Sequence, residues 1–175
     1  MRVIAGRLRS RRLKSVPGLD TRPTPDRLRE TLFNILAPRI AGTVFVDAYA
    51  GAGAVGIEAL SRGAARAIFI ERSRAALAVL RENLLSLDVL GSANVIAGKA
   101  ASVVGQYPAD IVFLDPPYEQ EREYAACLEV LGADPPPLVI VQHAAKFELP
   151  GVWGGLARVR LLKQGDNALS FLERR

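Results

Sequence analysis

Short apolar runs and amphipathic stretches alternate along most of the chain. Runs rich in valine, isoleucine, leucine and phenylalanine predict strands at 43–49, 66–71, 94–98, 110–115 and 138–142. Apolar residues at helical spacing predict a short helical piece after 98 and longer helices at 54–62, 73–90 and 121–132. Apolar strands separated by helices indicate an α/β fold, with a mostly parallel sheet covered on both faces.

The two ends of the chain depart from this alternation. Apolar runs at 156–162 and 168–173 flank Gly165-Asp166-Asn167, which predicts an antiparallel hairpin at the end of the sheet. Residues 1–23 alternate basic and apolar positions between glycine and proline breakers, which favours a short extended arm or hairpin over a helix. Thr24 fits the N-cap of a first helix, because a proline and an aspartate follow it.

Length and composition indicate one globular domain. A chain of 175 residues, half of them hydrophobic, fits a single domain over 1–175 with a sizeable core. The single cysteine, Cys127, forms no internal disulfide and is expected in that core. The start of the chain has no long apolar run, so we expect no signal peptide and no membrane span. We therefore expect a cytoplasmic protein, and a monomer.

Positive charge is confined to the start of the chain. Residues 1–30 hold nine basic and three acidic residues, a net charge of +6, whereas the other 145 hold 14 basic and 15 acidic residues, a net charge of −1. This confinement favours a polyanionic partner over a merely solubilising arm. We expect the arm, 1–23, and the helix after it to bind nucleic acid through these residues: Arg2, Arg7, Arg9, Arg11, Arg12, Lys14, Arg22 and Arg27.

A glycine-rich loop follows the first strand at 43–49 and opens the next helix. It contains Asp47, Tyr49, Gly51, Gly53 and Gly56. The glycines let the backbone turn tightly and approach a ligand, and Glu71, which ends the next strand, can accept both hydroxyls of a ribose. The glycine spacing also matches the dinucleotide fingerprint. Asp47 favours S-adenosylmethionine (SAM), because its carboxylate suits a cationic amino group and would repel a pyrophosphate.

The tetrad Asp115-Pro116-Pro117-Tyr118 directly follows the strand at 110–115. An exocyclic amine on a nucleic-acid base is a poor nucleophile, because its lone pair is delocalised into the ring. The carboxylate of Asp115 and the carbonyl of Pro116 can accept its two hydrogens at a spacing that the stiff prolines fix. Tyr118 offers a face on which the base can stack. The tetrad therefore predicts methylation of such an amine.

The chain resembles the bacterial RsmD family, whose members are SAM-dependent methyltransferases that modify the N2 of a guanine in 16S ribosomal RNA. The resemblance is carried by the segments Arg2–Arg7, Arg22–Asn34, Gly51–Ala64, Glu71–Arg72 and Asp115–Tyr118.

That resemblance implies a Rossmann-like class I methyltransferase fold with a seven-stranded sheet. It implies that SAM contacts the loop from Asp47 to Gly56 together with Glu71 and Arg72, and that Asp115 to Tyr118 hold the target amine. It also implies that the basic N-terminal arm engages ribosomal RNA, free or within a small-subunit particle.

Three other functions stay open at this point. A DNA adenine-N6 methyltransferase can use the same tetrad, although the short chain has no obvious added domain for reading a DNA sequence. A nicotinamide-dependent oxidoreductase accounts for the glycine loop but not for the tetrad. A non-catalytic RNA-binding factor would need neither. No histidine, cysteine and carboxylate have metal-ligand spacing, so we expect no metal, and we expect His143 to be hydrogen-bonded or exposed rather than catalytic.

Overall fold

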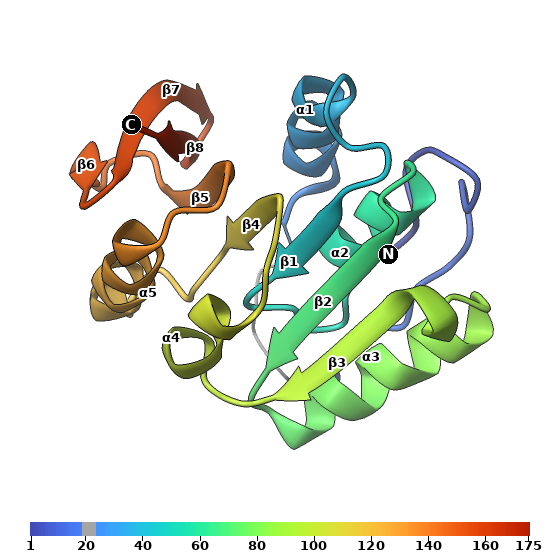
Figure 1. Ribbon diagram of the computed structural model, residues 1–175. Coiled ribbons are helices and arrows are strands. Elements are labelled where there is room, and N and C mark those ends of the chain that lie inside the picture. Colours follow the sequence, from blue (N-terminus) through green and yellow to red (C-terminus); the bar gives the residue numbers. More distant parts are fainter. Residues whose placement is uncertain (19–23) are drawn as a thin grey trace.

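A single twisted sheet runs through the centre of the molecule (Figure 1). The computed structural model describes residues 1–18 and 24–175, and within them the sheet has eight strands in the order β3-β2-β1-β4-β5-β8-β7-β6. They are β1 (Val44–Asp47), β2 (Arg66–Glu71), β3 (Ala93–Ala97), β4 (Ile111–Leu114), β5 (Leu138–Ala144), β6 (Val152–Trp153), β7 (Leu156–Gln164) and β8 (Asn167–Arg174). The pairs among β1 to β5 are parallel, and β8, β7 and β6 extend the sheet in antiparallel pairs.

Helices cover both faces of the sheet, as the apolar strands predict. They are α1 (Asp26–Leu36), α2 (Ala54–Ser61), α3 (Arg74–Ser86), α4 (Ala100–Val103) and α5 (Glu121–Ala133), with short 3₁₀ turns at Leu90–Ser92 and Val104–Gln106. The alternation of side chains along β4 shows the two layers. Ile111 and Phe113 pack with α1 and α2, whereas Val112 and Leu114 pack with α4 and α5.

Two predicted boundaries are wrong for local reasons. The sequence implies seven strands, and the eighth is β6, whose two residues are too short to produce a periodic pattern. The helix predicted to reach Leu90 ends at Ser86 instead. Asp88 has a φ of +56°, which no helix continues through, and a separate 3₁₀ turn follows it. No helix in the described part of the chain is long and apolar enough to cross a membrane.

The start of the chain folds into an N-terminal hairpin (residues 1–14), in agreement with the predicted arm or hairpin. Arg2 pairs with Arg12 in an antiparallel bridge. Val3, Leu8 and Leu13 are buried against side chains of α2 and α3. The hairpin is therefore part of the packed fold and not a loose tail (Figure 1).

Polar contacts fix the N-terminal hairpin to α2. The carboxylate of Glu58, which has no exposed surface, accepts hydrogen bonds from the backbone amides of Ile4 and Ala5 at 2.9 and 3.0 Å. A side chain at Gly6 would collide with the backbone of Ser61, since its Cβ would lie 2.0 Å from the carbonyl oxygen. The backbone of the hairpin around Gly6 therefore packs directly against α2.

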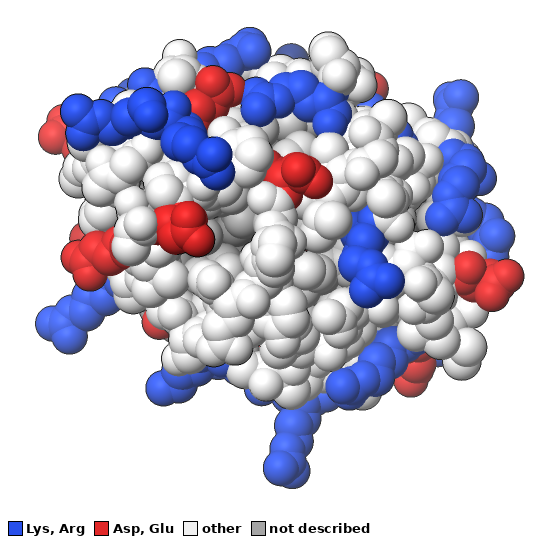
Figure 2. Space-filling view, in the orientation of Figure 1, with Lys and Arg blue, Asp and Glu red and all other residues white. Residues whose placement is uncertain are grey.

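The cations of the N-terminal hairpin point outward although its apolar residues are buried. Figure 2 shows lysine and arginine atoms along the right-hand edge of the molecule, where the hairpin lies, while the middle of this face carries few charges. Six basic residues of the hairpin are exposed: Arg2, Arg7, Arg9, Arg11, Arg12 and Lys14. Arg27 is exposed on α1, and Arg22 lies outside the described residues.

Candidate functional site

Three acidic residues meet at one edge of the sheet. Asp47 ends β1, Glu71 ends the neighbouring β2, and Asp115 follows β4 on the other side of β1. These strands are parallel, so their carboxyl ends lie together, which is the edge where ligands bind in open α/β sheets. Sequence reasoning selected all three residues, and the fold brings them together.

The three glycines of the loop have different reasons to be glycine. At Gly51 the φ is +55°, and an added Cβ would have no atom within 4 Å, so the backbone faces open space. At Gly53 and Gly56 a Cβ would lie 2.4 Å from Leu80 and 2.3 Å from Phe69. Gly51 therefore leaves room for a ligand, whereas the other two let α2 pack closely against α3 and β2.

Asp47 is a buried carboxylate beside this loop. Its side chain is part of a residue with 1% exposure and accepts a hydrogen bond from the amide of Gly56 at 2.9 Å. Burial raises the pKa of Asp47 to about 7, an effect that the amides of Gly56 and Tyr49 oppose and the charge of Glu71 reinforces. A cation placed beside Asp47 would restore its ionised form.

Glu71 holds the other side of the loop. Its Oε2 accepts from the amide of Gly51 at 2.8 Å, and its Oε1 accepts from the amides of Arg72 and Ser73 at 2.8 Å. A carboxylate has about four acceptor positions and three are used, so Glu71 keeps one, on Oε2, for a ligand hydroxyl. Ser73 also caps α3, since its side chain accepts a hydrogen bond from the amide of Ala76.

The side chains of two predicted cofactor-binding residues, Tyr49 and Arg72, do not point toward the loop. The hydroxyl of Tyr49 donates to Glu123 on α5 at 2.8 Å and lies 3.2 Å from the sulfur of Cys127. Arg72 is exposed, and its backbone amide, not its side chain, contacts Glu71. Tyr49 therefore joins the loop to α5 through its phenol, a contact between distant segments that no local pattern predicts.

The tetrad lies next to Asp47. Burial raises the pKa of Asp115 to about 7, against a hydrogen bond from Thr24 that lowers it, and the nearby charge of Asp47 raises it further. In the turn after β4, Pro116 is buried and Pro117 is exposed. The two carboxylates are therefore close enough to repel each other when both are ionised.

Tyr118 is held by residues of β5 and β8. Its hydroxyl donates to the side-chain oxygen of Asn167 at 2.5 Å, at the start of β8. The side-chain amide of Gln142, at the end of β5, lies 3.4 Å from the same hydroxyl. The tetrad thus contacts the turn of the terminal hairpin, which the sequence places about fifty residues away.

Thr24 is a site residue that sequence reasoning misplaced. The N-cap of α1 is Pro25, and no side chain caps this helix. Thr24 is buried instead, with its hydroxyl oxygen 3.2 Å from Asp115 Oδ2 and 3.2 Å from Gln142 Oε1. Its place in the segment Arg22–Asn34, which carries part of the family resemblance, was the available signal.

His143 is buried and hydrogen-bonded, as expected. Its Nδ1 contacts the carbonyl oxygen of Ala144 and its Nε2 contacts the hydroxyl of Ser170, both at 2.9 Å. Burial lowers the pKa of His143, which favours the neutral ring. Cys127 is fully buried, which confirms its place in the core. Among residues 1–18 and 24–175 there is no group of three or more histidine, cysteine or carboxylate side chains that could hold a metal ion.

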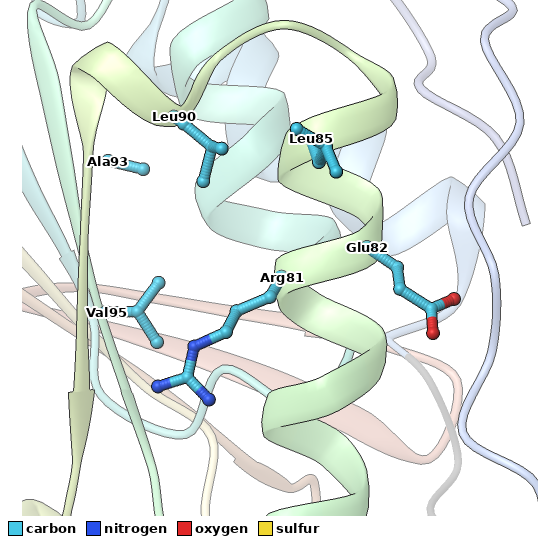
Figure 3. A pocket seen from close by; sticks show the side chains of 6 residues that line it. All are labelled: Arg81, Glu82, Leu85, Leu90, Ala93 and Val95. Carbon is cyan, nitrogen blue, oxygen red and sulfur yellow. The ribbon is translucent and has the colours of Figure 1, made fainter.

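A shallow apolar depression lies away from these residues (Figure 3). It is formed by the second half of α3 and the start of β3, at the opposite end of the sheet from Glu71. The side chains that line it are Arg81, Glu82, Leu85, Leu90, Ala93 and Val95. It offers none of the converging carboxylates found at the candidate site.

Comparison with known proteins agrees with this geometry. The chain is 33% identical over 183 residues to YlbH of Bacillus subtilis (strain 168), provisionally named an rRNA methyltransferase, with 100% of both proteins covered. It is 46% identical over 122 residues to ribosomal RNA small subunit methyltransferase D of Escherichia coli (strain K12), a match that covers 69% of this chain and 61% of that protein.

Solved structures show the same fold. A structure of yhhF from Escherichia coli, provisionally described as a methyltransferase, has a TM-score of 0.85 at 38% identity, covering 100% of this chain and 98% of that one. The profile of the family described as conserved hypothetical protein 95 matches residues 1–173. The chain therefore belongs to this family, the RsmD family that its sequence resembles.

Proposed function

We propose that this chain transfers a methyl group from SAM to the exocyclic N2 of a guanine in small-subunit (16S) ribosomal RNA. The observation that carries the proposal is the adjacency of Asp47 and Asp115. One carboxylate stands beside an open glycine loop and the other begins an Asp-Pro-Pro-Tyr tetrad, on neighbouring strand ends. Membership of the RsmD family, and the ribosomal RNA named for its relatives, support the substrate class.

The residues around the loop fit SAM. The backbone at Gly51 faces open space, and Asp47 offers a buried carboxylate to the ammonium group. Glu71 has one spare acceptor position, on Oε2, for a ribose hydroxyl. The carboxylate of Asp47 beside the loop disfavours the pyrophosphate of a nicotinamide dinucleotide. When bound, SAM supplies an electrophilic methyl group on a sulfonium.

The tetrad supplies the groups that the target amine needs. The carboxylate of Asp115 and the carbonyl of Pro116 accept the two amine hydrogens, so that the nitrogen lone pair faces the methyl group. This role requires the ionised form of Asp115. Tyr118, held by Asn167, offers its ring to the base.

The N-terminal hairpin is well placed to hold RNA near these groups. The backbone of Lys14 exchanges hydrogen bonds with the side chain of Asn83, which also donates to the carbonyl of Ala52 in the glycine loop. Lys14, the last exposed cation of the hairpin, therefore lies near the cofactor loop, and the other cations extend away from it. They would contact phosphates and position the RNA without reading its sequence.

Labelling tests the proposal directly. Tritiated SAM, the purified protein and either naked ribosomal RNA or small-subunit particles from cells lacking the protein should give label in a guanine. Asp115→Ala should lower the transfer rate by about 10²–10³-fold while SAM still binds, because one preorganised acceptor is lost. Glu119→Ala is the matched control, since this exposed carboxylate follows the tetrad directly.

Other outcomes would point to the alternatives. Label in a DNA adenine would assign the enzyme to the adenine-N6 class, and thermal stabilisation by NAD instead of SAM would assign it to the oxidoreductases. Binding of ribosomal RNA with no transfer to either form of the substrate would indicate a non-catalytic factor. Near-normal turnover of Asp115→Ala would contradict the amine-holding role of the tetrad.

A further inference from the structure

Thr24 connects two strand ends that lie far from it in the sequence. Its hydroxyl oxygen is 3.2 Å from Asp115 Oδ2, after β4, and 3.2 Å from Gln142 Oε1, at the end of β5. Both Thr24 and Gln142 are buried, at 8% and 3% exposure. A buried hydroxyl between two acceptor oxygens is a position where the direction of each hydrogen bond matters.

The orientation of Gln142 follows from its other neighbours. Tyr118 donates its only hydroxyl hydrogen to Asn167 Oδ1, so its oxygen accepts from Gln142 Nε2 at 3.4 Å. The amide of Gln142 then presents Oε1, an acceptor, to Thr24. One chain of hydrogen bonds therefore runs from Asp115 to Tyr118, the two side chains that the tetrad uses on the base.

The single hydroxyl hydrogen of Thr24 can serve only one of its two acceptors at a time. When Asp115 is ionised, the strongest acceptor is its carboxylate, and the hydrogen turns toward Oδ2. When Asp115 is protonated, its own hydrogen can be donated to Thr24, which then donates to Gln142. The direction of the chain thus changes with the charge of Asp115.

We propose that Thr24 is a positioning residue for methyl transfer, whose hydroxyl hydrogen turns to Asp115 Oδ2 and leaves the other carboxylate oxygen to accept the target amine. The proposal rests on the proposed function, because it gives Thr24 a purpose only if Asp115 holds an amine. It extends that function to a residue outside the glycine loop and the tetrad. When Asp115 is protonated, Gln142 accepts the hydroxyl hydrogen of Thr24. When Asp115 is ionised, Gln142 competes with it for that hydrogen.

Few other charged groups face Asp115 among the described residues. Asp47 faces it from β1, and Tyr124 on α5 and Tyr118 in the tetrad lie near it. Burial raises the pKa of Asp115 to about 7, and the hydrogen bond from Thr24 opposes this rise. Burial and nearby charges raise the pKa of Tyr124 above its usual value, so this phenol stays neutral where Asp115 titrates. Loss of the Thr24 hydroxyl should therefore move the titration of Asp115 upward.

The test compares Thr24→Val, Thr24→Ser and Gln142→Met. Transfer rates at saturating RNA and SAM are measured from about pH 5.5 to 9.5, a span that brackets the titration of Asp115. Thr24→Val should move the acid limb of kcat upward by about one pH unit or more, because a hydrogen bond to a charged group is lost. Its rate should then approach that of the wild type at high pH, with SAM affinity unchanged.

The other two variants separate positioning from packing. Thr24→Ser keeps the hydroxyl and should restore the wild-type limb. Gln142→Met removes the competing acceptor but not the hydroxyl, so its limb should lie at or below that of the wild type. An unshifted limb in Thr24→Val, or a limb in Gln142→Met raised as far as in Thr24→Val, would overturn the proposal. So would Thr24→Ser behaving like Thr24→Val.

A measurement without turnover separates this proposal from the function on which it rests. The carboxyl carbon of Asp115 can be titrated by NMR in the wild type and in Thr24→Val, with Asp115→Asn to assign the signal. A higher pKa in Thr24→Val, in a protein that methylates no RNA, would contradict the proposed function and keep the Thr24 contact. Equal pKa values in an active enzyme would contradict the role of Thr24 alone.

Discussion

Binding of SAM should depend on pH through Asp47. The pKa of this buried carboxyl is raised to about 7 from a usual value of 3.8, so in the free protein it carries a proton over much of the mildly acidic range. A bound ammonium group favours the carboxylate, and an opposite charge at this range lowers a carboxyl pKa by about 1–3 units. Binding should therefore release a proton from Asp47 below about pH 7.

The size of the effect follows from the two pKa values. If the bound pKa falls to about 5, two units below that of the free protein, the apparent Kd for SAM should be about tenfold higher at pH 6 than at pH 8. Each unit of pKa difference corresponds to about 1.4 kcal/mol, and the dependence should level off above about pH 8, where Asp47 is already ionised. Near pH 7, about half a proton should be released per SAM bound.

Calorimetric titration in buffers of different ionisation enthalpy measures both the affinity and the protons released. Asp47→Asn should bind SAM more weakly and without pH dependence, because the amide cannot ionise yet still accepts from Gly56. Asp115→Asn should keep a pH dependence. S-adenosylhomocysteine has the same amino end and no sulfonium, so it should show the same linkage as SAM. A Kd for SAM that does not change with pH in the wild type, or a pH dependence that persists in Asp47→Asn, would refute the reasoning.

Two further predictions concern the loop and the N-terminal hairpin. Gly56→Ala should destabilise the protein by about 1–3 kcal/mol, because its Cβ would lie 2.3 Å from Phe69, whereas Gly51→Ala should reduce SAM affinity more than stability. Denaturant unfolding and SAM titration of both variants measure these effects. The prediction would be contradicted if Gly56→Ala lost as much SAM affinity as Gly51→Ala and no stability. Replacing Arg7, Arg9 and Arg12 together by Gln should weaken RNA binding and retain SAM affinity. The slope of log affinity against log salt concentration should become flatter by about 0.7 per lost phosphate contact. RNA affinity at several salt concentrations checks this, and an unchanged slope would indicate that these cations only make the protein soluble.

Much of the fold follows from the sequence because buried parallel strands are continuously apolar. The runs around Val46, Phe69, Phe113 and Ile140 have no polar face, which distinguishes them from the amphipathic helices between them. The acids at the strand ends are also readable, since a polar residue that ends an apolar run lies at the ligand-binding edge. The acids Asp47, Glu71 and Asp115 lie together because β1 pairs with both β2 and β4, an order of strands that the apolar runs allow but do not specify.

The contacts of Thr24 could not be predicted from its local sequence, and only its place in the segment Arg22–Asn34, which carries part of the family resemblance, indicated a role at the site. A threonine before Pro25 and an acidic first turn is the local pattern of an N-cap, and nothing nearby distinguishes the two uses of its hydroxyl. Its partners, Asp115 and Gln142, are 91 and 118 residues away. Local propensity gave way because the Thr24 hydroxyl supplies a hydrogen bond to the carboxylate of Asp115, which stabilises the fold more than capping a helix that begins at an exposed proline.

The N-terminal hairpin shows why charge alone is an incomplete guide. Its cations indicate a polyanion, but its apolar residues make it part of the core, and Arg29 of α1, with no exposed surface, donates to the carbonyl of Arg2 at 2.5 Å. That contact ties the hairpin to the first turn of α1, directly after Thr24 and Pro25. Deleting the hairpin would therefore disturb the surroundings of Asp115 as well as RNA binding. Only variants that remove charge and keep Val3, Leu8 and Leu13 can separate its electrostatic role from its structural one.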